Sequence, residues 1–236
     1  MLHKIGVIGD VHAQHRYLET ALHYLVEQNV DTIVCTGDLV DGEGDVNACI
    51  RLLQAFNVHT VRGNHDRWIL QHKVRHLPNA HLLEQLDPES AEYLASLPNQ
   101  VHLNTNAGPL MLCHGVGDHD LQKIWPGTDA LPAKRSKDLD HIIAQGKYTL
   151  MINGHVHYRT LIHFHALTLL NAGTLRGDHH PGFALLDLVQ NCVHGYELEP
   201  AVHPVKTLSL APPNNKHVFR DTQHFDDTWE PVTLYA

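Results

Sequence analysis

The chain has 236 residues, of which 43% are hydrophobic and 18% charged, so we expect a folded globular protein rather than a disordered one. The formal net charge of -9 argues against a long nucleic acid as the main partner, because proteins that bind one usually carry a basic face. The 4 Cys form no CxxC pair, which argues against a disulfide framework and a thiolate zinc site. We recognise no signal peptide and no apolar run that could span a bilayer, so we expect a cytoplasmic protein without a membrane partner.

Predicted strands and helices alternate in the first part of the chain. Residues 5–8 form a short apolar strand, and an amphipathic helix follows over 16–28. A second strand at 32–35, a helix over 45–56 and a third strand at 59–61 continue the pattern. This order predicts parallel strands joined by right-handed crossovers, a sheet in which ligands bind beyond the carboxyl ends of the strands.

The later part of the chain predicts more strands than helices. Residues 110–113 and 148–152 are apolar strands, and a helix is predicted over 136–145 between them. Strand-like runs follow that are closely spaced, as in an antiparallel meander; they cover residues 160–165, 167–171, 182–189 and 193–199.

Polar side chains follow five of the predicted strands at the point where each strand ends. The stretches are GDVH (9–12), GDLVD (37–41), GNHD (63–66), CHG (113–115) and GHVH (154–157). Each alone is typical of a turn or loop, but together they supply carboxylates, an amide and imidazoles. That mixture of oxygen and nitrogen ligands is used by Mn, Fe, Zn and Co sites, and the chain has 23 His in all. The series therefore predicts a metal site at the strand ends.

Two of these stretches place polar residues two apart around a valine. They are Asp10-Val11-His12 and His155-Val156-His157. In an extended chain, alternate side chains point to the same side. We therefore expect each pair to reach one metal cluster while its Val points into the core.

The ordered series GDVH, GDLVDG, GNHD, CHG and GHVH resembles the calcineurin-like metallophosphoesterase family over about residues 3–190. It looks most like the small prokaryotic phosphodiesterases and hydrolases of dinucleoside polyphosphates in that family. The resemblance implies an α/β (α+β) fold, a two-layer β-sandwich flanked by helices, with a dinuclear metal centre at the strand ends. It also implies one metallophosphoesterase domain over residues 1–199, with 200–236 as a C-terminal extension of the same domain.

The resemblance further implies ligands for two divalent metal ions (Mn, Fe, Zn or Co, with Mn or Fe favoured). One ion would be bound by Asp10, His12 and His157, the other by Asn64, His114 and His155, and both by Asp38.

Catalytic and substrate-binding roles are also implied or predicted. By resemblance, His65 acts on the substrate while Asp66 orients His65 or the neighbouring loop. A hydroxide between the metal ions would attack phosphorus. Arg16, Arg67 and Arg176 lie near the motifs, and guanidinium groups suit phosphate oxygens, so we predict that they bind substrate.

Other residues yield weaker predictions. Trp68 and Trp125 could stack on a base. His163 and His165 lie on one strand face, which we expect to meet solvent. A group of His after the third strand is expected to give at most one residue to the site; it comprises His72, His76 and His81.

The predicted function is a metal-dependent phosphoesterase that hydrolyses a phosphodiester or nucleotide-type bond in a small molecule. Phosphoprotein phosphatases of this superfamily read GDxHG, GDxxDRG and GNHE, and this chain departs from them at Ala13, Gly42 and Asp66. A phosphoprotein or small-molecule phosphomonoesterase is therefore the alternative. A non-catalytic scaffold is less expected, because every ligand position is filled. The physiological substrate and the oligomeric state stay open.

Overall fold

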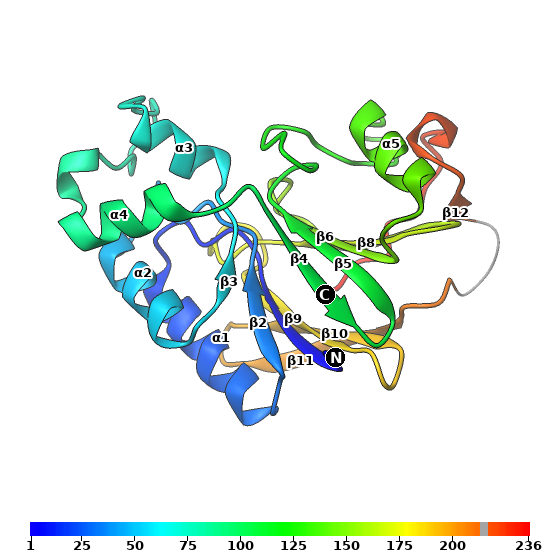
Figure 1. The fold of residues 1–236 in the computed structure, drawn as a ribbon, viewed down its shortest axis with the longest axis horizontal. Coiled ribbons are helices and arrows are strands. Elements are labelled where there is room, and N and C mark those ends of the chain that lie inside the picture. Colours follow the sequence, from blue (N-terminus) through cyan, green and yellow to red (C-terminus); the bar gives the residue numbers. More distant parts are fainter. Residues whose placement is uncertain (213–216) are drawn as a thin grey trace.

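The computed structural model describes residues 1–212 and 217–236. The chain forms two mixed β-sheets of six strands each, stacked face to face (Figure 1). The strand order is β11-β10-β9-β1-β2-β3 in the first sheet and β12-β7-β8-β6-β5-β4 in the second.

The first sheet begins with the strand–helix alternation that the sequence predicts. β1 (Lys4–Ile8), β2 (Thr32–Cys35) and β3 (His59–Thr60) run parallel. The connections are α1 (His15–Glu27) and α2 (Val46–Ala55). Because each crossover returns the chain to the same edge, the carboxyl ends of these strands lie together.

The predicted antiparallel meander is wrong, because its strands belong to two different sheets. β7 (Arg159–Phe164) and β8 (Thr168–Ala172) form a hairpin in the second sheet. β9 (Gly182–Asp187) and β10 (Cys192–Glu197) form another hairpin, and β9 pairs antiparallel with β1. β11 (His203–Ser209) then adds to the edge beyond β10. Every residue of β7 and β9 is buried, so their sequences lack the alternation that would assign them to one face.

The second sheet also combines parallel and antiparallel pairs. β4 (Gln100–Thr105) pairs antiparallel with β5 (Gly108–Cys113). β6 (Leu150–Asn153) runs parallel to β5, and α5 (Lys137–Gln145) lies in the connection between them. β12 (Val218–Phe219) adds a short parallel strand beside β7.

Short helices link the two sheets. α3 (Asn64–Leu70) begins directly after Gly63, whose backbone N–H donates to the carboxylate of Asp66 at 2.9 Å. η1 (Leu83–Gln85) and α4 (Pro88–Ser96) follow. None of the helices in the described ranges is long and apolar enough to cross a bilayer.

Three apolar clusters hold these layers together. Leu22 of α1 and Ile50 of α2 pack on the outer face of the first sheet. Val7 and Leu112 meet between the two sheets. Leu139 of α5 packs on the outer face of the second sheet. The architecture is therefore the predicted two-layer β-sandwich flanked by helices, with α1–α4 on one side and α5 on the other (Figure 1).

The C-terminal residues pack into this sandwich. After β12, the chain forms a 3₁₀ turn, η3 (Thr222–His224). Leu234 is 0% exposed and lies in the cluster between the sheets. Its backbone N–H donates to the carbonyl of Arg159 at 2.8 Å, and the Nε of Arg159 donates to the carbonyl of Leu234 at 2.7 Å. The side chain of Leu234 therefore belongs to the inter-sheet core.

Candidate metal centre

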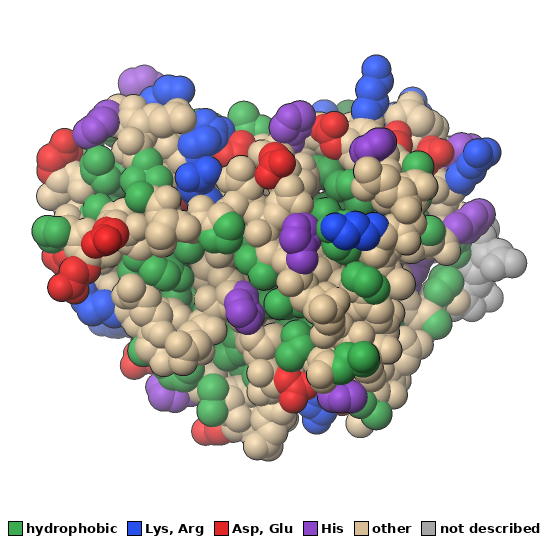
Figure 2. Space-filling model, in the orientation of Figure 1, with side chains coloured by type: hydrophobic (Ala, Val, Ile, Leu, Met, Phe, Trp, Pro, Cys, Tyr) green, Lys and Arg blue, Asp and Glu red, His purple; other side chains and the backbone are tan. Residues whose placement is uncertain are grey.

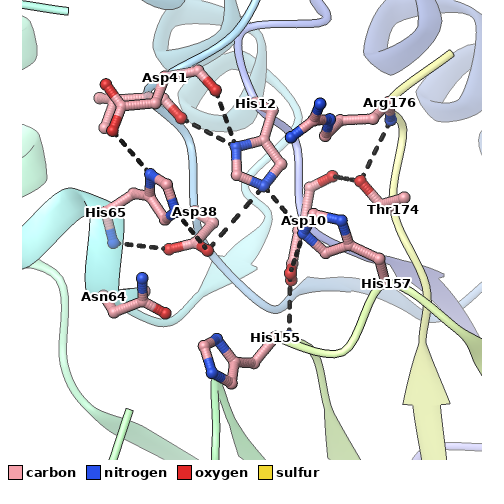
Figure 3. A network of polar contacts seen from close by, with 12 residues as sticks. Asp10, His12, Asp38, Asp41, Asn64, His65, His155, His157, Thr174 and Arg176 are labelled. Atoms are coloured by element: carbon pink, nitrogen blue, oxygen red, sulfur yellow. Dashed lines mark hydrogen bonds and ion pairs between the residues drawn. The ribbon is translucent and has the colours of Figure 1, made fainter. Parts of the chain in front are cut away.

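The predicted ligands come from strand ends of both sheets and meet at one edge of the sandwich (Figure 3). Asp10 follows β1 by two residues, and Asp38 follows β2 by three. Asn64 opens α3. From the second sheet, His114 directly follows β5, and His155 lies two residues beyond β6.

Asp10, His12 and His157 form the first group, and one ligand atom from each lies within 4.8 Å of the others. His12 Nε2 is 3.1 Å from His157 Nε2, which is 3.4 Å from a carboxylate oxygen of Asp10. His12 Nδ1 lies 3.1 and 3.0 Å from the carbonyl oxygens of Val40 and Asp41. Carbonyl oxygens only accept, so Nδ1 carries the proton and Nε2 presents its lone pair to the group.

Asp38, His114 and His155 form the second group, with the same 4.8 Å limit between ligand atoms. His114 Nδ1 donates to the carbonyl of Thr36 at 2.8 Å. Its Nε2 faces Asn64 Oδ1 at 3.0 Å and Asp38 Oδ2 at 3.3 Å. Three ligand atoms therefore converge, and only a proton or a cation can lie between them favourably.

Asp38 lies between the two groups. Its Oδ2 is 3.3 Å from His114 Nε2 and 4.0 Å from His12 Nε2. Its other oxygen accepts a hydrogen bond from the backbone N–H of His65 at 2.9 Å, which fixes the carboxylate plane. This placement suits a carboxylate that contacts two cations at once.

Burial and the neighbouring carboxylates shift the pKa values of the site in different directions. Burial raises the pKa of Asp10 to about 7 and lowers that of His12 to about 4. Burial alone would lower the pKa of His114, but the charges of Asp38 and Asp10 raise it to about 10. The same field that draws a proton to His114 would draw a divalent cation. The nitrogen and oxygen donors present therefore fit two divalent metal ions.

Several of these residues have a left-handed backbone, which side-chain-bearing residues rarely adopt. The φ angles are 45° at His12, 48° at Asp38, 68° at His155 and 61° at His157. The expected extended backbone is therefore wrong. Asp10 and His12 do lie in one group with Val11 buried, as expected. His155 and His157 lie in different groups, and Val156 is only partly buried. These imidazoles are oriented by tight turns, which the periodicity of the sequence does not reveal.

Glycines allow the motif loops to approach one another closely. A Cβ atom at Gly63 would collide with the carboxylate of Asp38, and one at Gly154 would collide with that of Asp10. Both glycines are thus needed where the sequence places them, directly before Asn64 and before His155.

His65 is held by a contact that the sequence reading missed. Its Nδ1 lies 2.6 Å from Asp41 Oδ2 (Figure 3). Asp41 is held in turn by His81, whose backbone N–H donates to Asp41 Oδ1 at 2.8 Å and whose Nδ1 accepts from the Asp41 backbone N–H at 3.0 Å. Burial lowers the pKa of His65, but the bond to Asp41 and nearby carboxylates outweigh it and raise that pKa.

Asp66 serves the loops beside His65. Its carboxylate accepts from the backbone N–H of Leu39 at 2.7 Å and of Gly63 at 2.9 Å. Of the two roles implied for Asp66, these bonds match the holding of the neighbouring loop.

Residues 3–191 match the calcineurin-like phosphoesterase superfamily domain. The chain belongs to this superfamily. Membership of this superfamily supports the interpretation of the chain as a phosphate-ester hydrolase. An uncharacterised protein of Methanocaldococcus jannaschii is 26% identical over 128 residues, which are 51% of this chain and 52% of that protein. The chain thus spans about half the length of the curated relative it matches.

Three solved structures have the same fold as this calcineurin-like phosphoesterase. A metallophosphoesterase from Sphaerobacter thermophilus is 22% identical, with a TM-score of 0.59 over 87% of this chain and 89% of that one. A candidate diadenosine tetraphosphatase is 21% identical, with a TM-score of 0.60 over 87% and 95%. An archaeal phosphodiesterase is 17% identical, with a TM-score of 0.54 over 83% and 99%.

The arginines predicted to bind substrate have different surroundings in this phosphoesterase. Arg67 forms a two-point ion pair with Asp120, at 2.5 and 3.0 Å. Arg176 lines the cavity over the metal centre, but both arms of its guanidinium bind Asp178, at 3.0 and 2.8 Å. Arg16 is exposed on the first turn of α1 and is not among the described residues that line that cavity.

A cavity of about 430 Å³ opens over the predicted ligands of the phosphoesterase. Besides ligands and His65, its lining includes Arg75 and Lys123, two cations that the sequence reading missed. They come from the segment after α3 and from the loop after β5, and no motif marks either of them. Trp68 also lines the cavity, as the base-stacking prediction requires.

Trp125 and His163 lie elsewhere. Trp125 is buried against Tyr158 and Trp229, in the cluster outside the second sheet. The expectation that His163 meets solvent is wrong, because it is 4% exposed, whereas His165 is exposed beyond the end of β7. A buried histidine on a strand that is buried on both faces gives no signal in the hydrophobic pattern.

Proposed function

We propose that this protein is a metal-dependent hydrolase of a phosphodiester or nucleotide-type phosphate bond in a small molecule. One observation carries the proposal: Asp38 lies between two groups of ligand atoms, and His65 lies beside it. When bound, two divalent metal ions, Mn or Fe by preference, supply a hydroxide nucleophile and neutralise phosphate oxygens.

The chain's own side chains divide into two ligand sets around Asp38. Asp10, His12 and His157 would hold one ion, and Asn64, His114 and His155 would hold the other. Carbonyl acceptors fix the proton on the outer ring nitrogen of His12 and of His114. The inner nitrogen of His12 is then already in the form that binds a metal, because burial lowers the pKa of His12 to about 4. His114, whose pKa is raised to about 10, would give up the proton on its inner nitrogen when a metal ion binds.

His65 provides the proton for the leaving group. Asp41 accepts from its Nδ1, and its Nε2 points to the centre, 4.0 Å from Asp38 Oδ2. An Nε2–H in that position would donate to the leaving oxygen as the bond to phosphorus breaks. A well-placed general acid of this kind typically contributes ~10²–10⁴-fold in rate.

The size and charge of the surface support a small phosphate ester. The cavity of about 430 Å³ matches the usual range for small-molecule sites. Among the described residues on the face in Figure 2, Lys and Arg side chains are interspersed with Asp, Glu and His. The archaeal phosphodiesterase and the candidate diadenosine tetraphosphatase with the same fold support a diester or nucleotide substrate.

A phosphomonoesterase is the alternative function. In the phosphoprotein phosphatase pattern an Arg stands where this chain has Gly42. A Cβ atom at Gly42 would collide with the backbone carbonyl of His12. An arginine could therefore not be placed there without a shift of the loop that carries His12, and this argues against a phosphoprotein phosphatase; a small-molecule phosphomonoesterase stays the alternative.

The proposal is tested with two chromogenic esters. Release of p-nitrophenolate is measured from bis(p-nitrophenyl) phosphate and from p-nitrophenyl phosphate, with Mn²⁺ added and with EDTA as the control. We expect faster release from the diester, abolished by EDTA. Faster release from the monoester would favour the alternative, and release that EDTA does not affect would overturn the metal-dependent mechanism.

A further inference from the structure

Arg75 and Lys123 line the cavity over the metal centre without an acidic partner. The ion pairs of the described residues include Arg67–Asp120 and Arg176–Asp178, but neither Arg75 nor Lys123 takes part in one. In a chain with a net charge of -9, two free cations in one cavity are a notable concentration of positive charge. Both are exposed, so a ligand can reach them.

Arg75 is positioned by an aromatic ring that also contacts the proposed catalytic histidine. Its guanidinium carbon lies 4.6 Å from the centre of the Trp68 ring. The Trp68 ring lies 5.1 Å from the ring of His65. A cation–π contact of this kind restricts the arginine and keeps its charge on the α3 side of the metal centre.

A cavity that adjoins the first one has the opposite charge. A second cavity of about 400 Å³ shares Leu77 and Arg176 with the first. Its lining includes the acidic residues Asp41, Glu43 and Asp178. The pairing of Arg176 with Asp178 leaves this cavity with an excess of negative charge, so a second anionic group of a substrate would be repelled from it.

We infer that Arg75 and Lys123 form a subsite for a second phosphate group of the substrate, in the cavity that both line over the metal centre. The inference rests on the proposed function, and it names a substrate class: esters that carry another phosphate near the scissile one. The metal centre would bind the scissile phosphate. The adjoining cavity, which is lined by acidic residues, would repel that additional phosphate. The substrate would therefore bind in one orientation.

A matched pair of chromogenic substrates tests this inference. Thymidine 5′-(p-nitrophenyl phosphate) is compared with its 3′-phosphorylated counterpart, since both release p-nitrophenolate and differ by one phosphate. We expect a KM about three- to tenfold lower for the 3′-phosphorylated ester, the effect of two partly exposed charge contacts. The variant Arg75→Gln/Lys123→Gln should lose this preference, so that its KM values for the two esters become equal.

The control variant removes the same charge elsewhere. Lys134 and Lys137 are exposed and lie outside the described cavity linings. Lys134→Gln/Lys137→Gln should keep the preference for the 3′-phosphorylated ester. Equal KM values for both esters in the wild-type protein, or a preference that survives Arg75→Gln/Lys123→Gln, would overturn the subsite.

Binding separates the failure of the subsite from the failure of the proposed function. Thymidine 5′-phosphate and thymidine 3′,5′-bisphosphate are titrated calorimetrically into the Mn²⁺-loaded protein. Tighter binding of the bisphosphate, lost in Arg75→Gln/Lys123→Gln, supports the subsite even if neither ester is hydrolysed. Equal binding of the two nucleotides overturns the subsite even in an active enzyme.

Discussion

The Nδ1 atom of His65 lies 2.6 Å from Oδ2 of Asp41, although His65 lies in the first turn of α3 and Asp41 in the loop after β2, 24 positions away. The bond sets the direction of the imidazole, because Nδ1 is turned to Asp41 and Nε2 to the metal centre. Asp41 has a left-handed backbone, with a φ of 63°. Asp41 is therefore a positioning residue for His65.

The first prediction concerns Asp41→Asn. Asparagine tolerates the left-handed backbone, so the loop should keep its shape. The charged acceptor for His65 is lost, and we expect kcat to fall about tenfold, less than the ~10²–10⁴-fold for losing a general acid, because His65 itself remains. KM and metal content should stay close to wild-type values. Kinetics and elemental analysis of the purified variant check this, and an unchanged kcat would remove Asp41 from the account.

The second prediction concerns His81, which holds Asp41. His81→Ala leaves the Asp41 backbone N–H without its acceptor, so we expect a severalfold lower kcat and little change in KM. His81→Asn supplies a side-chain oxygen near the position of Nδ1 and should restore most of the rate. If kcat falls by the same factor in both variants, the effect comes from packing and not from this hydrogen bond.

The third prediction concerns His65→Asn. The imidazole is not among the proposed ligand atoms, so both metal ions should remain bound. Turnover of bis(p-nitrophenyl) phosphate should fall at least about tenfold, because no proton reaches the leaving oxygen. Metal content is measured beside the rate. A full rate would remove His65 from the mechanism, and loss of metal would show that it is a ligand.

The metal-ligand candidates could be predicted because each lies at the end of an apolar strand. Parallel strands end at one edge of a sheet, so Asp10, Asp38 and Asn64 had to lie near one another. His114 and His155 follow strands of the other sheet. Only the ordered series of motifs related these two histidines to Asp10, Asp38 and Asn64.

Contacts between segments that are far apart in the sequence could not be predicted. His81 reaches Asp41 across 40 positions, and Arg67 pairs with Asp120 across 53. Neither pairing leaves a periodic pattern. Proximity to a motif favoured Arg67 as a substrate ligand, whereas its bidentate pairing with Asp120 occupies the guanidinium.

The fourth prediction concerns the C-terminal extension. We propose that residues 200–236 belong to the same domain as residues 1–199. Leu234→Ala should then lower the free energy of unfolding by about 2–5 kcal/mol, the usual cost of a cavity at a fully buried leucine. Val189→Ala is the control, because Val189 is 66% exposed. Urea unfolding checks this, and equal midpoints for both variants would show that the extension adds nothing to the core.

The central claim is that this chain binds two metal ions, that Asp38 would contact both of them, and that hydrolysis requires them. It is tested most directly by elemental analysis of the Mn²⁺-loaded protein, with rates on bis(p-nitrophenyl) phosphate measured at each metal content. The account predicts two ions per chain, a rate that follows occupancy, and loss of both metal and activity in Asp38→Asn. Full metal occupancy in Asp38→Asn, or full activity in protein stripped of metal, would contradict it.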